Sequence, residues 1–174
     1  MGVGKTTVGE RLRAVLECPF IDLDAHIEAQ QGARIGDVFA RAGEAGFRQL
    51  EAAALNEVVA RRPFGVIALG GGGALTEAAW RTLRQAGVVV RLEAPVEELA
   101  RRIHKQDSGA TRPLLSGADP QTVLASHLVA RERWYARADV CVDTVGKTAD
   151  IAAGAIVGLL EALKGGTPFG RGGA

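Results

Sequence analysis

The sequence has few aromatic residues and almost no net charge. Only 5% of its 174 residues are aromatic, and the formal net charge is +1. A nucleic-acid-binding surface needs a basic field and aromatic side chains for base stacking, so this composition argues against a nucleic-acid partner. No apolar run approaches the roughly 20 residues of a membrane-spanning helix. We therefore expect small-molecule partners, and neither a nucleic acid nor a membrane.

Cysteine and histidine are also scarce. Cys18 and Cys141 flank or lie in short apolar segments. This placement favours reduced thiols in the core of a cytoplasmic protein over a disulfide. The three histidines, His26, His104 and His127, lack the spacing of metal ligands, so we expect them to be surface or structural residues.

Short apolar segments alternate with helical patterns along the chain. Strands are expected at 19–24, 65–69, 88–92 and 139–143. Helices are expected at 6–16, at 25–60 with breaks at Gly32 and Gly43, at 76–85, at 94–104, up to Tyr135, and at about 150–163. This alternation predicts an α/β fold with a parallel sheet covered on both faces, in one domain over 1–163. The breaker-rich segment at about 105–119 reads as a lid, and 164–174 as a disordered tail.

The opening stretch GVGKTT resembles the end of a phosphate-binding loop, G-x-x-x-x-G-K-[ST]. Backbone N–H groups that open a helix form a nest for phosphate oxygens. In such a loop Lys5 reaches the β- and γ-phosphates, and the Thr6 hydroxyl ligates Mg²⁺. The sequence therefore predicts a nucleotide site.

Asp22 and Asp24 end the expected strand at 19–24. If both lie in the strand, their side chains point to the same face, at the end where open α/β sheets bind ligands. Two carboxylates there suit Mg²⁺ and the orientation of a hydroxyl group. A strand end followed by a helix N-cap is the alternative.

Three further motifs suggest contacts with a ligand, and each has an alternative interpretation. Arg48, on an expected helix, either clamps an anion or pairs with Glu51 on the protein surface. Four consecutive glycines, 70–73, follow a buried strand, either because a ligand approaches bare backbone or because the loop is a flexible connector. Arg112, in the lid, suits a transferring phosphoryl group, and Arg131 lies on the next helix; a solvated surface is the alternative for both.

Taken together and in this order, these motifs resemble the shikimate kinase family, within the nucleoside-monophosphate-kinase-like P-loop group. The resemblance runs from GVGKTTVG through DLDAHIE, GFRQLE, LGGG and TRPLL to ARERWY. It implies a three-layer P-loop kinase fold with a five-stranded parallel sheet of order 2-3-1-4-5. It also implies ATP-dependent phosphorylation of shikimate in aromatic amino-acid biosynthesis, by a monomer with ATP, shikimate and Mg²⁺ as its ligands.

The resemblance also implies a role for each matching residue. Thr6 binds Mg²⁺, with Asp22 behind it through water. Asp24 binds and activates the attacking hydroxyl, while Arg48 and Arg131 bind the carboxylate of shikimate. The glycine loop of Gly70, Gly71 and Gly72 packs against the ring. The phosphates of ATP are held by Arg112 and by Gly2, Val3, Gly4, Lys5, Thr6 and Thr7.

The sequence departs from the family near the adenine. Lys105 and Lys147 stand where the family often has arginine, and Ala149 where proline is common. Lysine can pack on a base but lacks the planar stack of arginine. Two alternatives remain open: a kinase of another small hydroxy acid such as gluconate, and a non-catalytic ligand-sensing module of the same fold.

The phosphate-binding motif begins at Met1, whereas in the family it follows the central strand of the sheet. We expect this first strand to be largely absent from the chain and to precede Met1 in the native protein, together with the loop's first glycine. A parallel sheet without its central strand leaves buried edge groups unpaired, at about 1–3 kcal/mol each.

Overall fold

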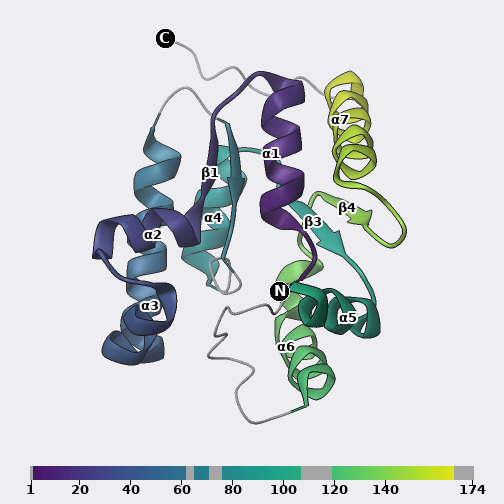
Figure 1. The fold of residues 1–174 in the computed structure, drawn as a ribbon. Coiled ribbons are helices and arrows are strands. Elements are labelled where there is room, and N and C mark those ends of the chain that lie inside the picture. The colour runs from purple at the N-terminus through teal and green to yellow at the C-terminus, as the bar shows by residue number, and fades with distance from the viewer. Residues whose placement is uncertain (1, 62–64, 71–75, 107–118, 167–174) are drawn as a thin grey trace.

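The computed structural model describes residues 2–61, 65–70, 76–106 and 119–166 (Figure 1). In these ranges the chain alternates between helices and short strands, as the sequence predicts. In chain order the elements are α1 (Lys5–Leu16), β1 (Phe20–Asp22), α2 (Leu23–Gln31), α3 (Ile35–Ala60), β2 (Val66–Ala68), α4 (Glu77–Ala86), β3 (Val90–Glu93), α5 (Val96–Gln106), α6 (Pro120–Tyr135), β4 (Val140–Asp143) and α7 (Ala149–Gly166).

The helix boundaries follow from local chemistry. Thr76 is the N-cap of α4, where its side chain accepts a hydrogen bond from the Ala79 N–H at 3.1 Å. Helix α2 ends at Gly32, and α3 is kinked at Gly43, which has φ 66° and ψ 178°. A side chain is strained at that positive φ, so glycine is the residue that allows the break. Both expected helix breaks at these glycines are confirmed.

The strands form two parallel pairs. In one, Ile21 of β1 pairs with Ile67 of β2; in the other, Leu92 of β3 pairs with Val142 of β4. In the described part of the chain, β2 and β3 belong to different sheets. In the expected order 2-3-1-4-5, the β1–β2 pair corresponds to strands 2 and 3, and the β3–β4 pair corresponds to strands 4 and 5.

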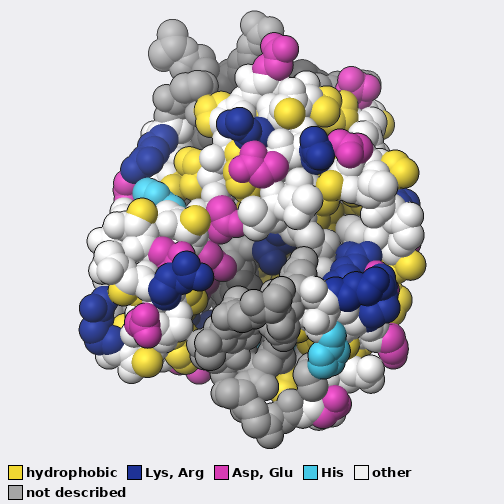
Figure 2. Space-filling model, in the orientation of Figure 1, with side chains coloured by type: hydrophobic (Ala, Val, Ile, Leu, Met, Phe, Trp, Pro, Cys, Tyr) yellow, Lys and Arg dark blue, Asp and Glu magenta, His cyan; other side chains and the backbone are white. Residues whose placement is uncertain are grey.

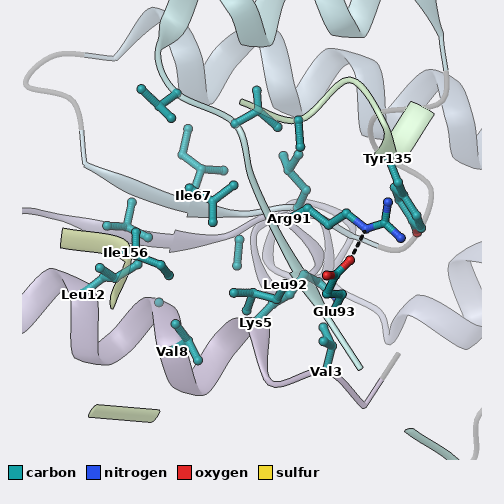
Figure 3. A pocket seen from close by; sticks show the side chains of 18 of the residues that line it. Val3, Lys5, Val8, Leu12, Ile67, Arg91, Leu92, Glu93, Tyr135 and Ile156 are labelled. Atoms are coloured by element: carbon teal, nitrogen blue, oxygen red, sulfur yellow. Dashed lines mark ion pairs between the residues drawn. The ribbon is translucent and has the colours of Figure 1, made fainter. Parts of the chain in front are cut away.

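An apolar cavity of about 1020 Å³ lies between the two pairs. Strand β2 lines one side and β3 the other, and α1 contributes Val8 and Leu12 (Figure 3). Figure 1 shows α1 in front of the strands and α4 behind the β1–β2 pair. The cavity therefore occupies the middle of the sheet layer.

Three clusters of buried side chains hold the helices to the strands. One joins α2, α3 and α4 through residues such as Leu23, Val38 and Leu55. A second joins α1, β4 and α7 through Leu12, Val142 and Ile156, and a third joins α5 to α6. Among the described residues, no helix is long and apolar enough to cross a membrane.

Three expectations were wrong in detail. Asp24 lies in the first turn of α2 rather than in a strand, because the chain turns into a helix directly after Asp22. Cys141 is exposed rather than in the core, since it is on the outward-facing side of β4, and Cys18 is half-buried. Helix α7 continues to Gly166, beyond the expected start of the tail at 164.

Candidate active site

The N-terminus of α1 is shaped to receive an anion. Its N-cap, Gly4, has a left-handed backbone with φ 92°, and no side chain caps the helix. The first turn carries no acidic residue. The amide dipoles at the start of a helix attract negative charge. Gly2, Val3, Gly4, Lys5, Thr6 and Thr7, the predicted phosphate-binding residues, therefore occupy a favourable position for phosphate.

Asp22 connects this helix end to the start of α2. Its Oδ2 accepts a hydrogen bond of 2.7 Å from the Thr6 hydroxyl. Its Oδ1 caps α2 by accepting from the N–H groups of Asp24, at 3.1 Å, and Ala25, at 3.3 Å. The two interpretations of Asp22 are therefore compatible. Asp22 caps α2, and it also lies beside Thr6, the predicted metal ligand.

Lys5 and Asp24 influence each other electrostatically. Burial lowers the pKa of Lys5, and the carboxylates of Asp24 and Asp22 oppose this effect. Burial also raises the pKa of Asp24; the charge of Asp22 adds to this rise, and Lys5 opposes it. The region therefore brings an ammonium group and two carboxylates together where solvent is partly excluded.

Gly70 lies directly against Asp24. A Cβ atom at Gly70 would be 2.3 Å from Asp24 Oδ1 and 3.1 Å from Glu51 Oε1. Bare backbone at the start of the glycine run therefore makes room for these two carboxyl groups. Gly71 and Gly72 lie outside the described residues.

Glu51 also lies beside this candidate site, although the sequence considered alone indicated it only as a partner of Arg48. It is 3% exposed and lies on α3 beside Gly70. The other buried side chains of this part of α3 include Phe47, Leu55 and Val58, so Glu51 lies on the core-facing stripe of the helix. A carboxylate on an apolar stripe was the signal that could have identified it.

The two expected carboxylate-binding arginines come from different helices. Arg48 of α3 donates a hydrogen bond to Glu44, one turn earlier. This bond lowers the pKa of Glu44, and the charge of Arg131, on α6, contributes to the same effect. Arg131 also contributes to the lowered pKa of Lys5, after burial. Arg131 is therefore within electrostatic reach of both Lys5 and the Arg48–Glu44 pair.

Two lysines predicted near the nucleotide base lie on neighbouring segments. Lys105 is exposed near the end of α5. Lys147 follows β4, and its ammonium group donates to the backbone oxygen of Asp143 at 2.9 Å. Arg112 and most of the expected lid lie outside the described residues.

A recess marks this part of the surface. Figure 2 shows a hollow in the middle of the molecule, with acidic side chains on its left rim and a group of Lys and Arg side chains on its right. Among the described residues, no three His, Cys, Asp or Glu side chains lie close enough together to hold a metal ion. A divalent cation here would depend on Thr6, Asp22 and a ligand's phosphates, the type of site that Mg²⁺ commonly uses.

Known proteins resemble the chain over most of its length. A family profile described as shikimate kinase matches residues 1–161. The shikimate kinase of Bordetella pertussis is 46% identical over 145 residues, which cover 83% of this chain and 67% of the relative. The solved structure of shikimate kinase from Acinetobacter baumannii in complex with shikimate superposes with a TM-score of 0.86 at 36% identity, covering 94% of this chain and 90% of the other.

A gluconokinase structure is more distant. The enzyme from Sinorhizobium meliloti superposes with a TM-score of 0.60 at 21% identity, and covers 96% of this chain and 93% of the other. At that identity the likeness concerns the fold alone.

Proposed function

The chain belongs to the shikimate kinase family, whose members phosphorylate shikimate with ATP, and from this premise we propose how its residues divide the reaction. The γ-phosphoryl group of ATP is transferred to the 3-hydroxyl of shikimate, so that one P–O bond forms and the bond to the ADP oxygen breaks. The products are ADP and shikimate 3-phosphate. Catalysis of this kind depends mainly on positioning and charge neutralisation.

The start of α1 holds the phosphates in this proposal. The amides of residues 2–7 face the phosphate oxygens, and Lys5 neutralises charge on the β- and γ-phosphates. Arg112 approaches the same phosphates from the lid. The nucleotide base packs between Lys105 and Lys147.

Thr6 and Asp22 fit a magnesium ion. Their oxygens are 2.7 Å apart, and both are hard oxygen donors at the phosphate end of the site. Thr6 would coordinate Mg²⁺ directly, and Asp22 through a water molecule. The ion would supply charge neutralisation between the phosphates.

Asp24 acts on the attacking hydroxyl group. Its backbone N–H is held by Asp22, and Gly70 leaves space on one side of its carboxyl group. It accepts the proton of the shikimate hydroxyl as the new P–O bond forms. Its raised pKa makes it a better proton acceptor than an ordinary aspartate.

Shikimate lies beside Asp24 in this proposal. Arg48 and Arg131 bind its carboxylate, and Gly70, Gly71 and Gly72 contact its ring. Arg48 then exchanges the Glu44 carboxylate for that of the substrate, which presents two oxygens to the planar guanidinium group.

We further place the protein in the cytoplasm as a monomer. Its ligands ATP and shikimate are small molecules, and the site is assembled from elements of a single chain. Sedimentation equilibrium with and without ADP would test the monomer.

The close approach of Lys5, Asp22, Asp24 and Thr6 carries this proposal, because it joins a phosphate site to a proton acceptor. The test is an ADP-release assay with shikimate, gluconate or no acceptor, with the product identified by mass. Phosphorylation of shikimate that depends on Asp24 supports the proposal. ADP release with no acceptor preference would contradict it, and a preference for gluconate would favour the alternative kinase.

A further inference from the structure

Arg102, on α5, makes contacts that no part of the proposed reaction requires. Its Nη1 donates to the Thr144 hydroxyl at 2.9 Å, and its Nη2 donates to the Thr144 backbone oxygen at 2.8 Å. Its Nε donates to Glu98, one turn earlier on α5, at 2.7 Å. All three nitrogen atoms of the guanidinium group thus donate hydrogen bonds, which fixes its orientation.

Thr144 is the first residue after β4 and is 4% exposed. Its hydroxyl accepts from Arg102 and donates to the backbone oxygen of Glu93, at the end of β3, at 3.0 Å. Its N–H donates to the same oxygen at 2.9 Å. Arg102 and Thr144 are 42 residues apart in sequence, and their contact ties α5 to the ends of β3 and β4.

The neighbouring stripe of α5, with Leu99 and Ile103, contacts the loop proposed for the phosphates. A Cβ atom at Gly2 would be 3.1 Å from the backbone oxygen of Leu99 and 3.1 Å from a side-chain carbon of Ile103. Val3 packs against the same buried cluster. Helix α5 therefore contacts both the loop proposed for the phosphates and the segment that begins at Thr144.

The segment from Thr144 to Lys147 is a tight turn. Gly146 has φ 65°, and the Lys147 N–H donates back to the Thr144 oxygen at 3.4 Å. The position of Lys147 is therefore set by Thr144 at the other end of the turn. Lys105 is on α5, three residues after Arg102.

We propose that Arg102 is a positioning residue, which sets the distance between Lys147 and the phosphate-binding loop and so fixes the base of the nucleotide. The inference rests on the proposed nucleotide site and names a residue outside it. Arg102 acts through Thr144 and does not touch ATP. Loss of the contact would release the turn from α5 while the phosphate loop keeps its own contacts with Leu99 and Ile103.

Arg101 provides a matched control on the same helix. It donates to both oxygens of Glu98, at 2.7 Å each, and is 54% exposed. It therefore shares a carboxylate partner with Arg102. Arg101→Met removes one arginine and one ion pair from α5, as Arg102→Met does, and leaves the Thr144 contacts in place.

The experiment compares ADP and inorganic pyrophosphate, both with Mg²⁺, by calorimetric titration of the full chain. Arg102→Met is expected to weaken ADP binding about five- to tenfold, since hydrogen bonds to a charged group are lost, and to leave pyrophosphate binding unchanged. Arg101→Met should bind both as the wild type does. Arg102→Lys, which keeps the charge and one donor direction, should recover part of the ADP affinity.

Two further results separate the inference from the proposed site. Lys147→Ala should also weaken the binding of ADP and leave the binding of pyrophosphate unchanged. If this variant binds ADP as the wild type does, the proposed base site is wrong, and the inference fails with it. If Lys147→Ala binds ADP more weakly and Arg102→Met binds ADP as the wild type does, only the proposed role of Arg102 is wrong. Equal losses for ADP and pyrophosphate in Arg102→Met would show a general structural role and would overturn the inference as well.

Discussion

Gly70 and Asp24 are in such close contact that the smallest side chain at position 70 would overlap the carboxyl group. The Cβ atom of an alanine would lie 2.3 Å from Asp24 Oδ1. The backbone after β2 therefore decides where the proposed proton acceptor lies.

Gly70→Ala should reduce kcat because Asp24 must shift to relieve the overlap. A displacement of about 1 Å in a catalytic group costs on the order of 10²-fold in rate. Steady-state assays with saturating ATP and shikimate would measure the loss. Gly158→Ala is the control, because it lies in α7 and its Cβ position has no neighbour within 4 Å apart from the adjacent backbone of the helix itself. Equal activity in the two variants would show that Asp24 tolerates the methyl group.

Asp24→Asn should fold normally and lose most of its turnover. An amide keeps the shape of the side chain but accepts no proton, and general-base contributions are roughly 10²–10⁴-fold. Burial and the charge of Asp22 raise the pKa of Asp24 above its ordinary value, so ionisation of this carboxyl group lowers the stability of the folded state at pH above that pKa. The melting temperature of the variant at pH 7 should therefore equal or exceed that of the wild type. A large fall in melting temperature would assign Asp24 a structural role instead.

The pH dependence of kcat/KM should show an acid limb above 3.8, the ordinary pKa of this side chain, because Asp24 must be ionised to accept a proton. Glu28→Gln should move this limb to lower pH, since the charge of Glu28 contributes to the raised pKa. Glutamine keeps an oxygen that can accept from the Ile35 N–H, as Glu28 does at 2.8 Å. Glu161→Gln, on α7, serves as the control. A limb at or below 3.8 in the wild type would remove Asp24 from the role of base.

Arg48→Lys should weaken shikimate binding and leave ATP binding intact. Lysine keeps the charge but cannot form the two parallel hydrogen bonds to a carboxylate. We expect KM for shikimate to rise about tenfold or more, which corresponds to the loss of one charged hydrogen bond. Arg41→Lys, also on α3, is the matched control, because it removes an exposed hydrogen bond to Gln31 of α2. If KM for ATP rises equally, Arg48 is structural.

Local sequence patterns were sufficient where local chemistry decides the structure. The breaks at Gly32 and Gly43, the Thr76 cap and helix α1 all depend on residues within one or two turns. Asp24 was misplaced because the switch from strand to helix after Asp22 depends on a capping interaction that periodicity does not show.

Long-range contacts could not be predicted from these patterns. The proximity of Gly70 to Asp24 and the contact between Arg102 and Thr144 depend on how distant segments pack. Glu51 is an intermediate case: its position on the core-facing stripe of α3 follows from helical spacing, but its closeness to Gly70 depends on long-range packing.

The cavity between β2 and β3 also makes this protein a starting point for an enzyme whose activity is regulated by an added peptide. The two strand pairs are both parallel, and the cavity between them is lined mainly by aliphatic side chains, with polar side chains such as Lys5, Arg91 and Glu93 among them (Figure 3). A short synthetic peptide of alternating valine and isoleucine, supplied separately, would find backbone partners on both sides and would bury apolar surface at about 25 cal/mol per Å². Its binding would be read directly as a rise in melting temperature and as tighter nucleotide binding. The reaction rate at low ATP concentration would then increase with the dose of an external peptide.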